Sequence, residues 1–156
     1  MDLGALVPPK AGLAVRIPGR ASGGLIPLPG VGRFATKDYI MRLFRVAGLL
    51  TGPTGRSEAV DLLVDTGATF LVVPRSLAER LELRTLRTCA IQTAGGRDET
   101  WPLAEVRIVL DGVEVTTPCL IAEGGPPLLG AVALESLLLG VDPVAKRLVP
   151  VKGFVG

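Results

Sequence analysis

Short apolar runs separated by turn-forming residues make up most of the chain from Met41 onward. Runs of this kind, bounded by Gly, Pro or Asp, are typical of strands in a buried sheet. Strong turn signals stand between the runs, notably Gly52-Pro53 and Asp111-Gly112. The pattern predicts strands over residues 41–50, 58–64, 70–73, 87–94, 99–110, 113–122 and 148–151.

Two segments have helical spacing instead. Pro74 is suited to open a helix, and Leu77 and Leu81 lie four apart on one face of it. A second helix is predicted over residues 132–139, with Leu134, Leu137 and Leu138 on its apolar face. With 20 Gly, 13 Pro and only 4% aromatic residues, the chain favours tight turns over a helical bundle. The prediction is a mainly β protein, a small closed β-barrel with one or two short helices.

Residues 1–40 differ from the rest. They hold seven Gly and five Pro, and neither strand nor helix periodicity lasts for more than a few positions. Five basic and two acidic residues give this segment a charge of +3. Such a composition indicates a disordered, weakly basic extension. The alternative is that Met41 is the true start, and in either case one folded domain is predicted over residues 41–156.

The composition excludes several kinds of chemistry. The chain has no His, which removes Ser-His-Asp catalysis, Cys-His catalysis and His-ligated zinc. Cys89 and Cys119 match no metal spacing, and we expect buried apolar thiols in a reducing cytoplasm, with a disulfide as the alternative. The net charge of +2 is too weak to indicate a nucleic-acid or membrane partner. We expect no metal and no cofactor.

The candidate chemistry lies in the triplet Asp65-Thr66-Gly67. Taken alone, the triplet is a weak signal, because all three residue types favour turns. Its context strengthens it, since three large apolar residues precede it and another apolar run begins at Phe70. An ionisable group between two core strands is costly unless its surroundings are built for it. Asp65 is therefore the candidate catalytic residue.

The run Leu63-Val64-Asp65-Thr66-Gly67-Ala68-Thr69 resembles the active-site loop of retropepsin-like aspartic proteases. Downstream, Leu128-Leu129-Gly130 and the predicted helix after it resemble the second signature of that family. The ending over residues 141–150 is similar to that of short bacterial members of the group. Two separated motifs in the right order are much more specific than either one. The likeness covers about residues 41–151.

The resemblance implies an aspartic endopeptidase that acts on polypeptides. Peptide hydrolysis without a metal or a covalent nucleophile needs a base to activate water and an acid to protonate the carbonyl oxygen. Two carboxylates that share one proton supply both roles. One chain carries only one such triplet. The resemblance therefore implies a homodimer in which the two Asp65 side chains meet at a twofold axis.

Supporting roles also follow from the resemblance. Thr66 would bond across the dimer axis, Gly67 would donate its N–H to the Asp65 carboxylate, and Ala68 and Thr69 would complete the loop. The residues Thr93, Ala94, Gly95 and Gly96 fall where the family places the flap that covers the substrate. The tip is shorter than in viral members, and an ordinary surface hairpin is the alternative.

Other interpretations stay open on the sequence alone. One is a binding or assembly module with the retropepsin fold and without useful turnover, which the short flap favours. Another is a small β-barrel in which Asp65 lies on an exposed hairpin tip. Trp101 is interpreted as a core aromatic residue, with the wall of a substrate pocket as its alternative. The burial of Asp65 and its distance from a second copy separate these interpretations.

Overall fold

The computed structural model describes residues 6–7, 15–16 and 43–156. Within the N-terminal segment it describes one antiparallel pair, β1 (Leu6–Val7) with β2 (Val15–Arg16). The predicted extension over residues 1–40 otherwise lies outside the described residues. Residues 43–91 and 100–156 form one compact unit, and this unit contains the candidate site.

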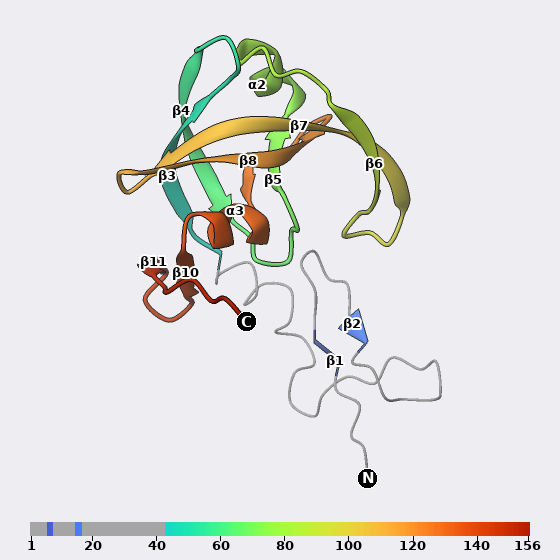
Figure 1. Cartoon of the computed structure of the whole chain (residues 1–156). Coiled ribbons are helices and arrows are strands. Elements are labelled where there is room, and N and C mark those ends of the chain that lie inside the picture. The colour runs from blue at the N-terminus through green and yellow to red at the C-terminus, as the bar shows by residue number, and fades with distance from the viewer. Residues whose placement is uncertain (1–5, 8–14, 17–42) are drawn as a thin grey trace. The chain divides into compact units, whose positions relative to one another are not determined.

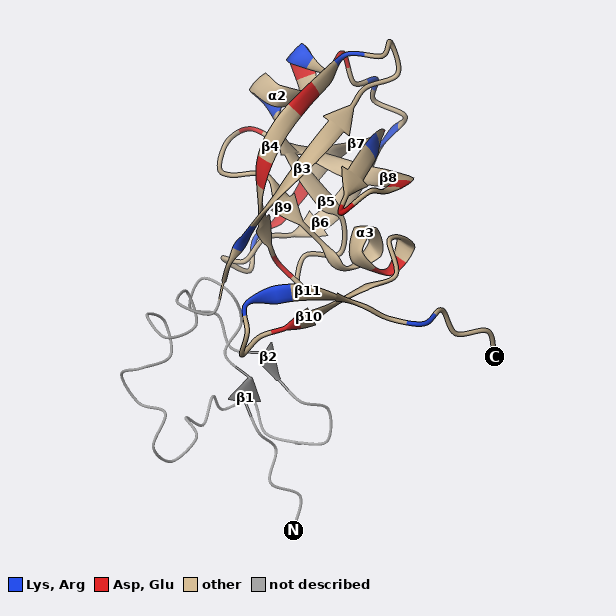
Figure 2. Cartoon of the chain, turned by 90° about the vertical axis from the view of Figure 1, so that its left-hand side faces the viewer, with Lys and Arg blue, Asp and Glu red and all other residues tan. Residues whose placement is uncertain are grey.

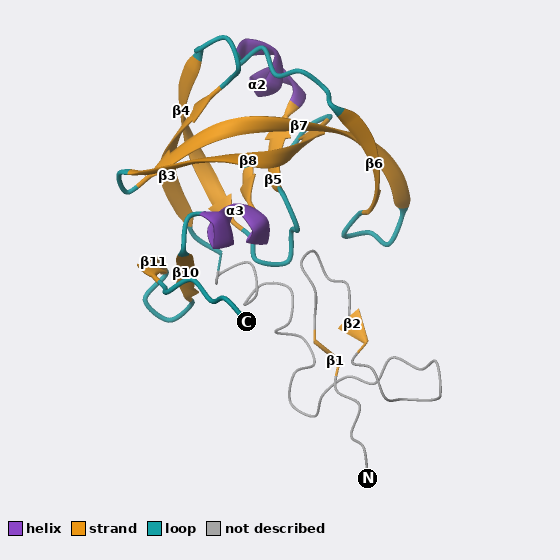
Figure 3. Cartoon of the chain, viewed as in Figure 1, coloured by secondary structure: helices purple, strands orange, loops and turns teal. Residues whose placement is uncertain are grey.

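The described chain is mainly β with two short helices, as predicted (Figures 1 and 3). The strands follow one another around a seven-stranded sheet in the order β3-β4-β9-β5-β8-β7-β6. An additional pairing of β3 with β7 closes six of these strands into a ring. Strand β6 lies outside the ring and has β7 as its one partner among the described strands. The strands are β3 (Arg45–Thr51), β4 (Ser57–Val64), β5 (Leu71–Pro74), β6 (Arg87–Gln92), β7 (Asp98–Leu110), β8 (Val113–Ala122) and β9 (Leu128–Leu129).

Two antiparallel hairpins build much of this sheet, and both follow from predicted turns. The first joins β3 to β4, and its turn is closed by the N–H of Gly55, which donates to the carbonyl of Gly52 over 3.1 Å. The second joins β7 to β8 through Asp111 and Gly112, whose φ angles are +49° and +79°. Left-handed geometry at both central residues is what a two-residue hairpin requires. Asp and Gly tolerate it better than other residues do.

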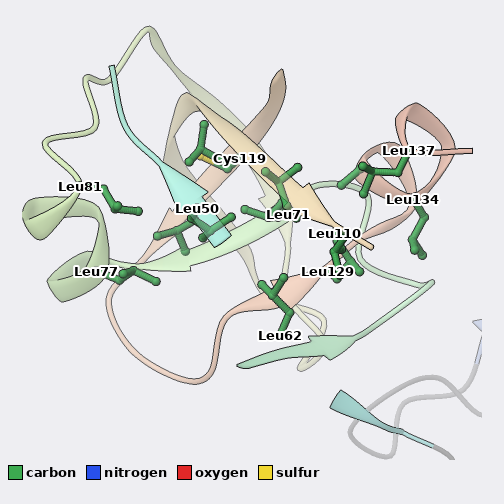
Figure 4. Close-up of a cluster of buried hydrophobic side chains, with 14 of the residues drawn as sticks. Leu50, Leu62, Leu71, Leu77, Leu81, Leu110, Cys119, Leu129, Leu134 and Leu137 are labelled. Atoms are coloured by element: carbon green, nitrogen blue, oxygen red, sulfur yellow. The ribbon is translucent and has the colours of Figure 1, made fainter. Parts of the chain in front are cut away.

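The core is formed by leucines from strands and helices that are far apart in the sequence (Figure 4). Helix α2 (Arg75–Arg80) begins after Pro74, as predicted, and contributes Leu77 while Leu81 follows at its end. Both thiols are buried and form no disulfide, as the sequence analysis expected. The fully buried leucines and isoleucine of the core are Leu50, Leu62, Leu71, Leu81, Ile108, Leu110 and Leu129.

The second helix is shorter than predicted. Helix α3 (Ala131–Ser136) buries Leu134 near its end, and Leu137 lies buried just after it. Leu138, in contrast, is 48% exposed and has a φ of +53°, so its predicted place on the apolar face was wrong. The left-handed residue stops the helix, and the apolar run continues as a strand. Periodicity alone cannot separate a short buried strand from a helical end.

The strand after α3 was not predicted. It is β10 (Leu139–Asp142), and it pairs antiparallel with β11 (Arg147–Pro150) in a separate two-stranded sheet. The predicted strand over residues 148–151 corresponds to β11, and a turn over residues 143–146 joins the two strands. No helix in the described part of the chain is both long and apolar enough to cross a membrane.

Candidate active site

Asp65 follows directly after the last residue of β4, where the chain leaves the core. Asp65 is one of the few buried polar residues in the described part of the chain, and the residue is 7% exposed. Its N–H donates to the carbonyl of Leu129 over 2.9 Å, and its own carbonyl accepts the N–H of Ala68 over 3.1 Å. This burial is inconsistent with the interpretation in which Asp65 lies on an exposed hairpin tip.

The loop after Asp65 turns polar backbone toward the carboxylate. The N–H of Gly67 donates to Oδ1 of Asp65 over 3.3 Å, which is the bond that the sequence analysis expected. Thr66, Gly67 and Thr69 are exposed, and Ala68 is half-buried. The acid is therefore buried, while the turn directly after it is exposed.

The second motif lies directly beside this loop. Strand β9 runs parallel to the end of β4, with Leu63 opposite Leu128 and Val64 opposite Leu129. It also pairs antiparallel with β5, where Val72 lies opposite Leu128. The structure thus brings together two of the predicted groups, the Asp65 loop and Leu128-Leu129-Gly130, from distant parts of the sequence.

Backbone hydrogen bonds continue the connection beyond the strands. The N–H of Ala131 donates to the carbonyl of Ala68 over 2.8 Å, and the N–H of Val132 donates to the carbonyl of Thr69 over 2.9 Å. Both donors belong to the first turn of α3, whose N–H groups have no partner inside the helix. The loop carbonyls therefore complete the helix, and the helix in turn holds the loop.

Gly130 is required by this close approach. A Cβ atom at this position would lie 2.2 Å from the carbonyl oxygen of Phe70 and 2.7 Å from that of Ala68. These neighbours are backbone atoms of the loop, and they cannot move aside without displacing it. The apolar pair followed by Gly thus has a physical reason in this fold.

A second apolar cluster begins at the end of the same loop. Val72, Cys89, Leu103, Leu120 and Ala122 are buried in it, and four half-buried residues pack against them: Phe70, Ile91, Trp101 and Leu128. This packing agrees with the interpretation of Trp101 as a core aromatic. Phe70 was expected in an apolar strand, but its place beside this second cluster was not predicted from the sequence.

The predicted flap residues form a tight hairpin turn. The N–H of Thr93 donates to the carbonyl of Arg97, and the N–H of Gly96 donates to that of Thr93, each over 2.8 Å. Gly96 has a φ of +75°, which a residue with a side chain rarely adopts. The closure of this hairpin over a substrate stays a prediction.

Among the described residues, no group of three Cys, Asp or Glu side chains lies close enough together to hold a metal ion. The chemistry available at the turn is that of the Asp65 carboxylate and the backbone N–H groups of its loop. A single carboxylate can act as a base or as an acid at one time, whereas hydrolysis by water needs both.

Comparisons with known proteins bear on this geometry. Residues 51–142 match the family model described as aspartyl protease, a range that includes both Asp65 and Gly130. The structure of EIAV protease with an inhibitor is similar with 24% identity and a TM-score of 0.49, covering 60% of this chain and 86% of that one. The solution structure of simian foamy virus (mac) protease is similar with 20% identity and a TM-score of 0.46, covering 60% and 94%. No curated protein matches the sequence.

Proposed function

Because this chain belongs to the aspartyl protease family, we propose that it is an endopeptidase that acts as a homodimer, with Asp65 as the catalytic carboxylate of each copy. The observation that carries the proposal is the burial of Asp65 at the end of a core strand, beside an exposed glycine turn. Burial of an acid is costly to a fold, so a buried acid at this position favours a chemical role.

The proposed reaction needs the two Asp65 carboxyl groups of the dimer to share one proton. Adjacent like charges force their titrations apart, as is established for aspartic protease dyads as a class. The ionised carboxylate takes a proton from water, whose oxygen then attacks the peptide carbonyl carbon. The protonated carboxyl group gives its proton to the carbonyl oxygen. The tetrahedral intermediate then breaks its C–N bond, and the carboxyl group that took the proton from water gives it to the leaving amine. The other carboxylate takes a proton from a hydroxyl of the intermediate, so the pair again holds one proton.

The neighbours of Asp65 have proposed supporting roles. The N–H of Gly67 holds one carboxylate oxygen in place, at 3.3 Å. Thr66 bonds across the dimer axis, and Ala68 and Thr69 shape the loop that faces the substrate. Leu128, Leu129 and Gly130 hold the loop from behind through backbone hydrogen bonds and the pairing of β9 with β4.

The dimer is part of the proposal, because residues 43–156 contain one Asp-Thr-Gly triplet. A twofold axis beside the loop would bring two identical acids together. A monomer would have only one of the two carboxyl groups and would not hydrolyse peptides. The hairpin at Thr93, Ala94, Gly95 and Gly96 is proposed to cover the bound polypeptide and exclude water.

The test compares Asp65→Asn with Asp61→Asn in the purified protein. Both residues belong to the same part of the chain, but Asp61 is exposed on β4 and lies 3.9 Å from Arg45. With an unfolded polypeptide at mildly acidic pH, we expect Asp61→Asn to retain cleavage and Asp65→Asn to lose at least roughly a thousandfold. Equal cleavage by Asp65→Asn and the parent protein would remove Asp65 from the mechanism.

The alternative function is a binding or assembly module with the same fold. The tight turn at the tip of the hairpin, closed by the bond between Thr93 and Arg97, is the observation that favours it. A module would bind unfolded polypeptide equally well with Asp65 and with Asn at this position. The module would also leave the polypeptide uncleaved at every pH at which the module itself remains folded.

A further inference from the structure

The arginines in residues 43–156 fall into two groups. Most of them are paired with a carboxylate on the surface of the protein, and around α2 and β4 the two signs of charge lie next to one another (Figure 2). These pairs are Arg45–Asp61, Arg56–Glu82, Arg75–Glu123, Arg80–Glu58, Arg97–Glu99, Arg107–Glu114 and Arg147–Asp142. Among the arginines of residues 43–156, Arg84 and Arg87 have no such partner.

These two unpaired arginines belong to one continuous exposed stretch. Every residue from Arg84 to Thr88 is exposed, and the side chain of Leu86 between them is 61% exposed. No Asp or Glu occurs between Leu83 and Arg97, so the local sequence offers no compensating charge. The stretch therefore has an exposed leucine that is flanked in the sequence by two exposed arginines.

The same stretch leads into a strand at the edge of the described sheet. Strand β6 begins at Arg87 and pairs with β7 alone among the described strands, outside the closed ring (Figure 1). An edge strand has backbone N–H and C=O groups along its outer side that another extended chain can pair with. Proteins often protect such edges with charge, and here the protecting charge has one sign only.

We propose that the segment from Arg84 to Ile91 is a docking site for an extended acidic segment of another polypeptide. That segment would add a strand to the outer edge of β6, with carboxylates opposite Arg84 and Arg87 and an apolar residue against Leu86. Main-chain hydrogen bonds supply affinity in strand addition, and side chains supply the selection. The planar guanidinium suits a carboxylate because it can donate two parallel hydrogen bonds.

The choice of an acidic peptide over a nucleic acid rests on the amount of charge. Two guanidinium groups are few for a phosphate backbone, and the whole chain has a net charge of only +2. An edge strand also offers alternating donors and acceptors, which match another polypeptide backbone. The site goes beyond the proposed hydrolysis, because it would bind a peptide whether or not Asp65 is active.

The test measures the binding of a fluorescein-labelled peptide that contains the motif Glu-Val-Thr-Glu, which in antiparallel register places Glu opposite Arg87 and Arg84 and Val opposite Leu86. The protein is full-length Asp65→Asn, which removes cleavage from the measurement. We expect the double variant Arg84→Glu and Arg87→Glu to weaken binding by about tenfold or more, because attraction becomes repulsion at two positions. The matched control is Lys146→Glu with Lys152→Glu, which changes the net charge equally at two exposed lysines. This control should bind as the parent does.

Three further results decide the mode of binding. The peptide with Lys in place of Glu should not bind, and the Glu peptide with alternate backbone nitrogens methylated should lose its affinity. Equal affinity of the methylated peptide would overturn strand addition, and equal losses in the two charge variants would overturn the assigned site. Tighter binding of a single-stranded oligonucleotide than of the peptide would also overturn the proposal.

Cleavage of a short neutral peptide should be unchanged by the Arg84 and Arg87 substitutions, which keeps this test separate from that of Asp65.

Discussion

The N–H of Asp65 donates to the carbonyl of Leu129 over 2.9 Å, so the candidate acid is fixed by the strand that precedes Gly130. Leu129 is fully buried, which makes this hydrogen bond part of the core and not of the surface. The position of the carboxylate is therefore set by the packing of β9 between β4 and β5. Substitutions in β9 should therefore shift the position of Asp65 even when they do not contact its side chain.

Gly130→Ala should destabilise the protein strongly. The added Cβ would meet the Phe70 carbonyl oxygen at 2.2 Å, and the loop would have to move. We expect a loss of roughly 2 to 4 kcal/mol in the free energy of unfolding, measured in urea. Gly124→Ala is the matched control, because a Cβ atom added at that position would have no neighbour within 4 Å. Similar unfolding midpoints for the two variants would contradict the assigned close approach.

Peptide cleavage should depend on the square of the intact fraction if two Asp65 side chains form one site. Mixing equal amounts of parent and Asp65→Asn chains, with exchange of subunits, leaves about one quarter of the dimers with both acids. We expect the specific activity per parent chain to fall to about half of its unmixed value. The measurement is cleavage after co-refolding of the two chains, with Asp61→Asn in place of Asp65→Asn as the control. An activity per parent chain that mixing leaves unchanged would indicate that each chain acts alone.

Cys119 should resist alkylation in the folded protein. Burial raises the pKa of its thiol from 9.0 to about 12, so at pH 8 only about one thiol in ten thousand is ionised. In a Cys89→Ser background, iodoacetamide should label Cys119 only after denaturation, as followed by mass spectrometry. Rapid labelling of the native protein at pH 8 would contradict this burial.

The same thiol should make stability depend on alkaline pH. The folded state keeps the Cys119 proton up to about pH 12, whereas the unfolded state releases it near pH 9. The unfolded state therefore holds fewer protons between these values, and stability should fall as the pH rises through this window. The Cys119→Ala variant should lack this contribution, which denaturant titrations at about pH 8 and about pH 10.5 can measure.

Asp142 should stabilise the hairpin of β10 and β11 in its ionised form. The N–H of Ala145 and, after it, that of Val144 donate to its Oδ1 at 2.9 and 3.1 Å, and they lower the pKa of this carboxyl with the help of Arg147. Stability from a lowered pKa is present above the ordinary value and is lost as the pH falls through the lowered one.

We therefore expect Asp142→Ala to be less stable than the parent at neutral pH, and the difference to shrink in strong acid. Thermal unfolding followed over a pH series measures it. Asp142→Asn is the control, because its amide oxygen can still accept the two N–H groups while the charge is gone. A difference between Asp142→Ala and the parent that does not change with pH would assign the effect to shape and not to ionisation.

Local features of the fold were predictable from the sequence because their causes are local. The turn at Asp111-Gly112 and strand β8 follow from residue types and alternation that any reader of the sequence can see. Helix α2 follows from Pro74 and the spacing of Leu77 and Leu81. The burial expected for Asp65 followed from the apolar runs on either side of it.

Long-range features were not predictable in this way. The pairing of Leu63 with Leu128 joins distant residues in parallel, and nothing in either local pattern specifies the partner. The exposure of Leu138 depends on its left-handed backbone, which helical spacing does not reveal. The resemblance placed the Asp65 loop and Gly130 in one family pattern, but the bond from Asp65 to Leu129 became visible only in the structure.

The dependence of Asp65 on Leu129 also has a consequence for how the protein is made. When the ribosome has translated β4, the residues of its parallel neighbour β9 have not yet been made. Pairing between strands that are distant in the sequence also forms late in folding. The acid therefore has no ordered surroundings until β9 and α3 have emerged from the exit tunnel. Nascent chains that stop before Pro127 would hold Asp65 in an unfinished loop, so the surroundings of the acid form only after β9 and α3 have been made.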